Sequence, residues 1–199
     1  MTKLFLSLLV TFALTLTAYA GTPGDGTILK VKTDQSTISW TGKKVTGKHH
    51  GIVNIKEGSL SLNDKGVLTG GNFIIDMPTI TVLDLEGNGK ANLEKHLKSD
   101  DFFGVETFPT ASLNVKNAKA TGNNTYDVTA DLTIKGITHE ITFPASVSVE
   151  GKEATAKAEI KIDRSLFDVR YGSGKFFENL GDKTIYDEFE LQVTLVAAR

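Results

Sequence analysis

The chain of 199 residues contains no cysteine, only four prolines and a single tryptophan. Without cysteine, no disulfide, thiol nucleophile, iron–sulfur cluster or thioether-linked haem can form, and no lipid can be attached through a cysteine. Clusters of basic residues are also missing, because lysines and arginines are scattered among slightly more numerous acidic residues, giving a formal net charge of −2. With no basic stripe to follow phosphates, we expect no nucleic-acid partner.

Long apolar runs are missing as well, except at the N-terminus. There Lys3 precedes an apolar run from Leu4 to Leu16, and Ala18 and Ala20 supply small residues at the two positions that a signal peptidase reads. This pattern predicts a signal peptide over residues 1–20. A membrane anchor is the alternative, but the run is shorter than the roughly 20 residues needed to span a bilayer. We expect a periplasmic protein without stable membrane insertion, in which residues 21–199 form one domain.

Motifs for catalysis and metal binding are not found either. The sequence has no G-x-S-x-G nucleophile elbow, and its four histidines do not have metal-ligand spacing. His49 and His50 are adjacent, so on a strand they would face opposite sides. We therefore expect no metal, no cofactor and no catalytic residue. An enzyme that uses His96 or His139 with a nearby carboxylate as acid and base is the competing hypothesis.

What the chain does have is strand-like alternation, clearest after Pro109. Apolar residues occupy every second position in several runs, among them Tyr126, Val128, Ala130, Leu132 and Ile134, and again Ala154, Ala156, Ala158, Ile160 and Ile162. Half-buried antiparallel strands give this pattern, whereas parallel strands buried on both faces would read as continuous apolar runs. The sequence predicts an all-β fold.

The first half of the chain predicts shorter strands and one helix. Strands are expected at residues 28–31, 38–41, 52–62 and 67–76, and Pro78 is expected to end the last of them. After the break at residues 87–89 the period changes, and Leu93, His96 and Leu97 share one helical face. We predict one short α-helical insertion near residues 89–99.

About eight such strands could close into a barrel or stack as a sandwich. A helix able to cap one end favours a barrel. The row of Ala154, Ala156 and Ala158 also favours it, because such small inward side chains would leave interior space unfilled. Tight sheet packing beneath a bulky neighbour is the other interpretation of this row. We predict an antiparallel β-barrel of about eight strands.

Between Asp163 and Asp187 the alternation stops, and the connection carries glycines together with Phe167, Tyr171, Phe176 and Phe177. A loop this rich in aromatic rings must cover them, and lying over a barrel mouth or lining a ligand entrance would do so. A small hydrophobic cluster beneath the loop explains the composition equally well.

Several motifs also occur together in a fixed order: Ser36-Thr37-Ile38-Ser39-Trp40, His50-Gly51, His96-Leu97-Lys98-Ser99-Asp100-Asp101-Phe102-Phe103, Phe108-Pro109-Thr110-Ala111, and Asp131-Leu132-Thr133-Ile134-Lys135-Gly136-Ile137-Thr138. This combination resembles the YceI-like family of bacterial periplasmic proteins, which are named for polyisoprenoid binding. The resemblance covers roughly Ile28 to Val196. It implies a lipocalin-like antiparallel barrel whose lumen takes an isoprenoid or similar amphiphilic lipid.

We therefore expect a periplasmic lipid-binding protein that holds a polyisoprenoid or fatty-acyl lipid for transport or storage. The residues that we predict to contact the lipid are Trp40, Phe73, Leu132, Phe143 and Phe189 in the wall, and Phe102, Phe103, Phe176 and Phe177 as gate or cap. Besides an enzyme, a ligand-free structural or stress-response protein with a packed barrel is open. A homodimer through an edge or mouth surface is also compatible with the sequence.

Overall fold

A computed structural model describes residues 26–199, so the predicted signal peptide lies outside the described residues. The described chain is mostly strand, with one α-helix, α1 (Gly87–Lys98), and two short 3₁₀ helices, η1 (Arg164–Phe167) and η2 (Gly181–Lys183). The strands are β1 (Thr27–Val31), β2 (Thr37–Lys44), β3 (Gly47–Leu62), β4 (Leu68–Val82), β5 (Thr110–Gly122), β6 (Thr125–Ile134), β7 (Ile137–Glu150), β8 (Glu153–Asp163) and β9 (Ile185–Ala198). Within residues 26–199, no helix has the length and apolar character needed to cross a membrane.

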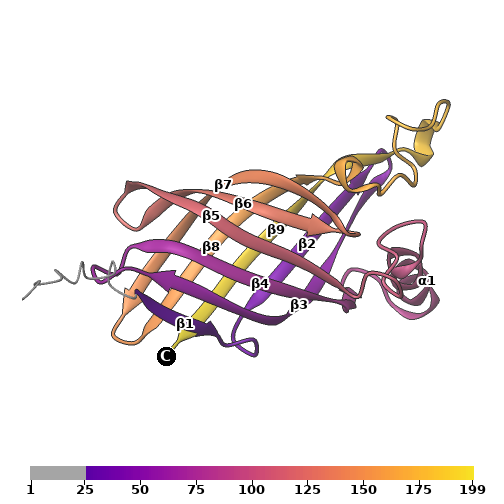
Figure 1. The fold of residues 1–199 in the computed structure, drawn as a ribbon. Coiled ribbons are helices and arrows are strands. Elements are labelled where there is room, and N and C mark those ends of the chain that lie inside the picture. The colour runs from indigo at the N-terminus through magenta and orange to yellow at the C-terminus, as the bar shows by residue number, and fades with distance from the viewer. Residues whose placement is uncertain (1–25) are drawn as a thin grey trace, which may run out of the picture.

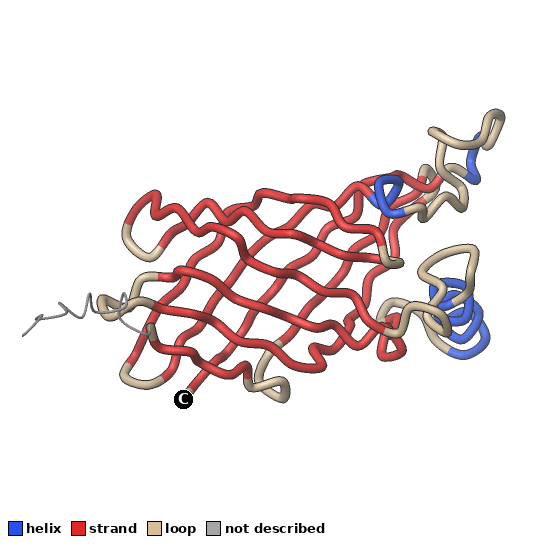
Figure 2. The backbone as a smooth tube through the Cα atoms, in the orientation of Figure 1, coloured by secondary structure: helices blue, strands red, loops and turns tan. Residues whose placement is uncertain are grey.

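The strands form a closed antiparallel barrel (Figures 1 and 2). Around the barrel the order is β3, β2, β9, β8, β7, β6, β5 and β4, and β4 pairs back onto β3. The short β1 lies between the same two strands as β2, because it pairs with the end of β3 and with Ala197 and Ala198 of β9. It therefore continues the position of β2 in the barrel wall. The predicted antiparallel barrel of about eight strands is confirmed.

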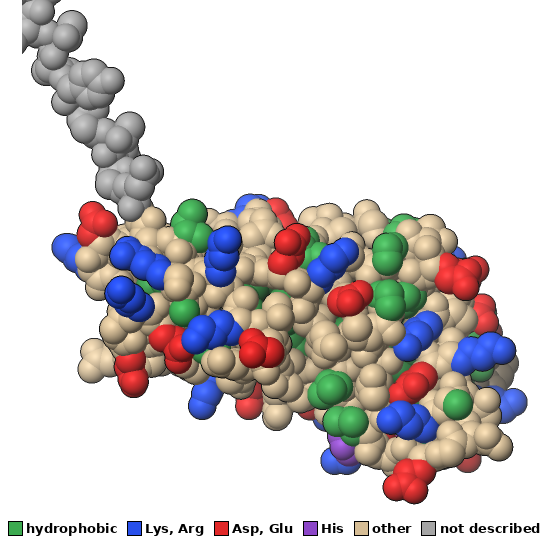
Figure 3. All heavy atoms as spheres, turned by 90° about the horizontal axis from the view of Figure 1, so that it is seen from below, with side chains coloured by type: hydrophobic (Ala, Val, Ile, Leu, Met, Phe, Trp, Pro, Cys, Tyr) green, Lys and Arg blue, Asp and Glu red, His purple; other side chains and the backbone are tan. Residues whose placement is uncertain are grey.

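Alternation along the strands places the apolar residues inside. On β6, all five alternating residues from Tyr126 to Ile134 are buried, while the intervening positions are exposed or half-buried. The outer face carries both signs of charge, as the space-filling view shows (Figure 3), with ion pairs such as Lys116–Asp131 and Lys43–Glu190 between neighbouring strands. The core is therefore the lumen side of one continuous sheet.

Pro78 does not end β4, which corrects the expected strand boundary. β4 continues to Val82, and its register against β3 shifts between the pairs Asn54–Asp76 and Ile52–Thr81. Because proline cannot donate a backbone hydrogen bond, the ladder is interrupted there. The Thr79 hydroxyl instead accepts a hydrogen bond from the Asn54 N–H at 2.9 Å. A bulge thus carries the strand past its proline.

A second proline marks the place where β7 separates from β8. These strands pair from Glu150–Glu153 to Ala145–Ala158, and no pairing follows although both strands continue. The Val147 N–H donates toward β6, to the Asn124 carbonyl, so by alternation residue 144 would direct its N–H toward β8. Pro144 has no N–H to give, so the ladder stops there while the pairing of β7 with β6 continues.

One end of the barrel is covered by two long connections, and we call it the mouth. Residues 83–109 join β4 to β5 and contain α1, which begins at Gly87, two residues before the predicted start. Residues 164–184 join β8 to β9 and contain η1 and η2. Figure 1 shows both connections at the same end, opposite the C-terminus.

Candidate functional site

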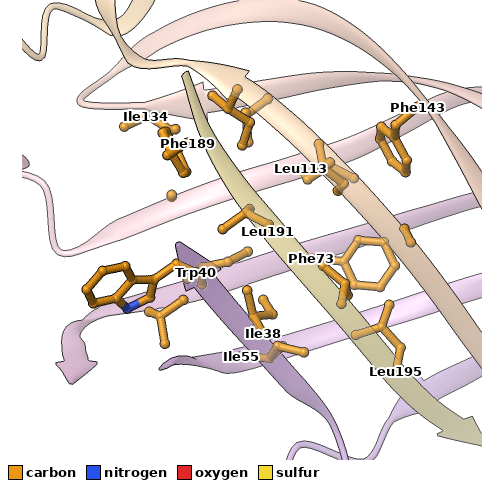
Figure 4. A pocket seen from close by; sticks show the side chains of 18 of the residues that line it. Ile38, Trp40, Ile55, Phe73, Leu113, Ile134, Phe143, Phe189, Leu191 and Leu195 are labelled. Atoms are coloured by element: carbon orange, nitrogen blue, oxygen red, sulfur yellow. The ribbon is translucent and has the colours of Figure 1, made fainter. Parts of the chain in front are cut away.

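The barrel contains an apolar cavity with a volume of about 210 Å³, counted as the space that the centre of a water molecule can occupy. Engineered apolar cavities of roughly 150 Å³ already admit a benzene molecule and stay dry. Figure 4 shows Trp40, Phe73, Phe143 and Phe189 around this space, each from a different strand. The interior is hollow, so the alternative of a completely packed barrel does not describe this structure.

Seven of the nine predicted contact residues line the cavity: Trp40, Phe73, Phe102, Phe103, Leu132, Phe143 and Phe189. The other two, Phe176 and Phe177, are 42 % and 49 % exposed and are not among the lining residues. The structure thus brings the wall residues and the Phe102–Phe103 pair together and leaves the second pair of phenylalanines apart. Contact of any of the nine with a lipid stays a prediction.

The lining owes its width to small residues on β7 and β8. Ala145, Ala156 and Ala158 all line the cavity, and Ala156 lies between Val147 and Leu195 in the pairing of β7, β8 and β9. Ala154, by contrast, is fully buried but does not line the cavity. Two of the three predicted alanines therefore leave space unfilled, and the third fits the tight-packing interpretation.

Trp40 is fixed in the wall by the residue opposite it. A Cβ added at Gly51 would lie 2.6 Å from the Trp40 ring and 1.8 Å from the Thr81 carbonyl oxygen, so only glycine lets the ring lie against β3. The indole N–H donates to the Ile52 carbonyl at 3.3 Å. Because Trp40 is the only tryptophan in the chain, its fluorescence reports on the cavity.

Aromatic residues after α1 form the cap at the mouth. Phe102 and Phe103 contact edge to face with centroids 5.0 Å apart, and Phe103 lies 6.5 Å from Phe189 in the same manner. Leu97 from α1 is buried beside them and also lines the cavity. The helix therefore contributes its apolar face to the closed end of the lumen.

Arg164 is a charged lining residue at the mouth that sequence reasoning missed. It is 2 % exposed, and its guanidinium lies 5.5 Å from the centre of the Phe102 ring. Three backbone carbonyls accept its hydrogen bonds: Nε donates to Tyr186 at 3.1 Å, Nη1 to Val169 at 2.7 Å and Nη2 to Ile185 at 3.0 Å. A signal was available, because Arg164 is the first residue after the alternation of β8 ends.

The electrostatics around Arg164 follow from its burial. Burial lowers the pKa of the guanidinium, and the carboxylates of Asp187 and Asp163 act in the opposite direction. Asp187 lies 3.5 Å from Nη2, and its Oδ1 has no hydrogen-bond partner among the described residues. Arginine remains protonated in proteins, so the mouth end of the cavity holds an ion pair between Arg164 and Asp187.

The histidines do not assemble a catalytic pair at the cavity. His139 Nε2 bonds to the Leu166 carbonyl oxygen at 2.9 Å, and the buried His96 Nε2 has no hydrogen-bond partner among the described residues. Within residues 26–199, the one histidine–carboxylate pair is His49–Asp84 at 2.8 Å, and neither residue lines the cavity. The described residues also contain no group of three potential metal ligands.

Asp84 ties the start of the α1 connection to β3. Burial by itself would raise the pKa of this carboxyl, but hydrogen bonds from the His50 backbone N–H and the His49 side chain outweigh it and hold the pKa below its ordinary value. This pair therefore holds the α1 connection against the barrel.

Comparison with solved structures confirms the fold. BcnA from Burkholderia cenocepacia aligns with a TM-score of 0.69 at 23 % identity, covering 84 % of this chain and 99 % of that one. A polyisoprenoid binding domain from Saccharophagus degradans, implicated in plant cell wall breakdown, aligns with a TM-score of 0.62 at 13 % identity, covering 85 % and 97 %. The Campylobacter jejuni YCEI protein aligns with a TM-score of 0.57 at 19 % identity, covering 74 % and 84 %.

Sequence relatives extend the comparison. A UPF0312 protein of Pseudomonas putida is 33 % identical over 104 residues, which is 52 % of each chain. A UPF0312 protein of Pseudomonas fluorescens is 43 % identical over 63 residues, covering 32 % of this chain and 33 % of that one. In these alignments the chain spans about half or less of the length of the curated relatives it matches. The family model of the YceI-like domain, however, matches residues 29–197, and the chain therefore belongs to the YceI-like domain family.

Proposed function

We propose that the protein binds a polyisoprenoid or similar long-chain amphiphile, with the tail in the lumen and the polar head at the mouth. The observation that carries this proposal is the hollow interior, whose inward side chains are apolar apart from the polar groups at the mouth end. The similarity in fold to a domain described as polyisoprenoid binding supports this ligand class.

The binding energy would come from the tail. Each buried methylene contributes about 0.8 kcal/mol, so ten tail carbons contribute about 8 kcal/mol before the cost of association is subtracted. A wall built from large apolar side chains, such as Phe73, Phe143 and Leu191, supplies this burial without any directional contact. The site would therefore select for tail length and width more than for exact chemistry.

The head group would meet Arg164. A guanidinium has five N–H donors, and the three backbone carbonyls occupy one each. Two N–H groups are left for Asp187 or for an acceptor on the ligand. An amphiphile with a phosphate, carboxylate or hydroxyl head would fit this end better than a plain hydrocarbon.

A periplasmic carrier or store fits the proposal, because the predicted signal peptide would export the chain and a lipid in an aqueous compartment needs shelter from water. Catalysis finds less support, since neither His96 nor His139 has a carboxylate within ion-pair distance among the described residues. We propose a binding protein and not an enzyme.

Extraction of the purified protein tests the proposal. The protein is expressed from its full-length coding sequence, purified without detergent and analysed by native mass spectrometry and by mass spectrometry of an organic extract. We expect about one lipid per chain. After delipidation, added polyprenyl phosphate should change the fluorescence of Trp40. Recovery of no stoichiometric lipid, together with no response to added polyprenyl phosphate, would contradict the proposal.

A further inference from the structure

Large apolar side chains are exposed mainly at one end of the molecule. Five of them lie on the connection from β8 and on the start of β9, and we call them the mouth patch: Leu166, Tyr171, Phe176, Phe177 and Tyr186, which are 42–51 % exposed. Two more, Val45 and Leu83, lie at the same end, in the β2–β3 turn and directly after β4. The opposite end exposes Ile28 and Val149.

The loop that carries the mouth patch is ordered by its own contacts. Buried Ser173 accepts backbone hydrogen bonds from Phe176 at 3.2 Å and Phe177 at 3.0 Å. The Tyr171 ring lies 4.3 Å from the His96 ring of α1. The phenylalanines are thus held at the surface, where burial in the fold does not account for them.

The mouth patch is continuous with the cavity. Tyr186 belongs to both, since it is half exposed and also lines the lumen, and the neighbouring Ile185 lines the lumen as well. Ile185 is joined to the loop by a hydrogen bond from its N–H to the Gly172 carbonyl at 2.8 Å. Apolar surface therefore runs from the outside of the loop into the site.

The charges of the loop cancel. Its exposed or half-buried ionic residues are three basic and three acidic ones: Arg170, Lys175 and Lys183, and Asp168, Glu178 and Asp182. Arg170 pairs with Asp168 and also covers the Phe176 ring at 5.0 Å, while Lys175 pairs with Asp163 at 2.6 Å. A partner surface that binds this loop would therefore be held by apolar contacts, with little net electrostatic attraction.

We propose that the mouth patch docks on the surface of a lipid bilayer, so that an amphiphile passes between the bilayer and the lumen without crossing water. The patch exposes roughly 400–500 Å² of apolar side chain, judged from the size of aromatic residues, whereas a stable protein interface needs roughly 800 Å² from each partner. Phenylalanine and tyrosine suit the boundary of a bilayer, where the ring is buried and the hydroxyl stays wet. The proposal rests on the lipid binding proposed above.

Vesicle binding tests the proposal. The full-length coding sequence is expressed, and mass spectrometry confirms that residues 1–20 are gone, because an apolar leader would itself bind vesicles. The wild type is compared with Phe176→Ser/Phe177→Ser and with a matched control at the other end, Ile28→Ser/Val149→Ser. Each is sedimented with vesicles of phosphatidylcholine, alone or mixed with phosphatidylglycerol, at low and high salt.

We expect the wild type and the control to bind both kinds of vesicle with little effect of salt, and the loop variant to bind roughly tenfold more weakly or worse. Equal binding by the loop variant would overturn the proposal, and so would wild-type binding that requires phosphatidylglycerol and is lost in salt. A wild-type dimer that the loop substitutions dissociate would also overturn it, because a second copy would then be the partner.

A lipid-transfer assay separates docking from binding. A pyrene-labelled fatty acid is followed from donor to acceptor vesicles, and its equilibrium binding is measured separately through Trp40. The loop variant should slow transfer roughly tenfold or more and weaken equilibrium binding far less, because Phe176 and Phe177 do not line the cavity. Equal losses in both would overturn docking, because the loop would then belong to the pocket. If no probe enters the lumen while vesicle binding still requires the phenylalanines, lipid binding fails and docking stands.

Discussion

Replacing Ala156 with leucine would test whether the barrel is hollow. Ala156 is buried and lines the cavity between Val147 and Leu195. A leucine here would place three additional carbons in the lumen. If that space is empty, the new side chain should gain contact without displacing its neighbours, and it should also occupy volume that a ligand needs.

The sign of the stability change is the informative quantity. Burying three more carbons in free space is worth up to about 2 kcal/mol, which for a domain of this size raises Tm by roughly 4–8 °C. Overfilling a packed interior instead costs about 1–3 kcal/mol. Ala130 is the matched control, because it is fully buried but does not line the cavity. Ala130→Leu should therefore destabilise.

Both variants are delipidated before thermal and urea unfolding, since a bound lipid would stabilise the folded state by itself. Ligand capacity is measured by extraction of undelipidated protein. We expect Ala156→Leu to be at least as stable as the wild type and to retain less than half of its lipid. A loss of stability equal to that of Ala130→Leu would refute the hollow lumen.

The other predictions concern the mouth and the wall. Arg164→Met should lower the free energy of unfolding by roughly 3 kcal/mol in urea titrations, because three carbonyls lose a buried donor. Burial by itself raises the pKa of Asp163, but hydrogen bonds led by that of Lys175 lower it overall, so the stabilisation is present above its ordinary value of 3.8 and lost as the pH falls below it. The protection factors for hydrogen exchange in the loop, which correct for the intrinsic pH dependence of amide exchange, should accordingly fall in acid, and those of Asp163→Asn should be low at every pH. Gly51→Ala should cost roughly 2 kcal/mol and shift the emission of Trp40, because the added methyl meets the ring at 2.6 Å.

The barrel was predictable because each strand has one face buried in the lumen and one face exposed to solvent. In β6 and β8, every second residue faces the lumen, so the alternation appears directly in the sequence. Closure was less certain from local pattern, since a sandwich has the same alternation. The helix and the alanine row favoured the correct choice, and the position of Leu97 beneath the cap was visible in the helical spacing.

Other features depend on which strands become neighbours, and local pattern does not contain this information. Pro78 was expected to end a strand because it cannot donate a hydrogen bond, yet a bulge opposite Asn54 accommodates it. Pro144 does interrupt a ladder, but only the observed order of strands shows that it faces β8. Arg164 stands out in the sequence only as the first residue after the alternation of β8, and its role at the mouth could not be predicted from that, because its three acceptors follow it at distances of 5 to 22 residues.

The interrupted ladder and the mouth patch belong to the same part of the barrel. On the mouth side of Pro144, side chains of β7 and of the β6–β7 turn bind the β8–β9 connection: His139 of β7 bonds to the Leu166 carbonyl, and Lys135 of the turn donates to the Asp168 carbonyl at 3.1 Å. Each such bond is worth about 1 kcal/mol, so separating the strands here costs less than breaking a continuous ladder. The stretch of wall beside the mouth patch is therefore easier to separate than the stretch where β7 and β8 pair continuously, from Glu150–Glu153 to Ala145–Ala158.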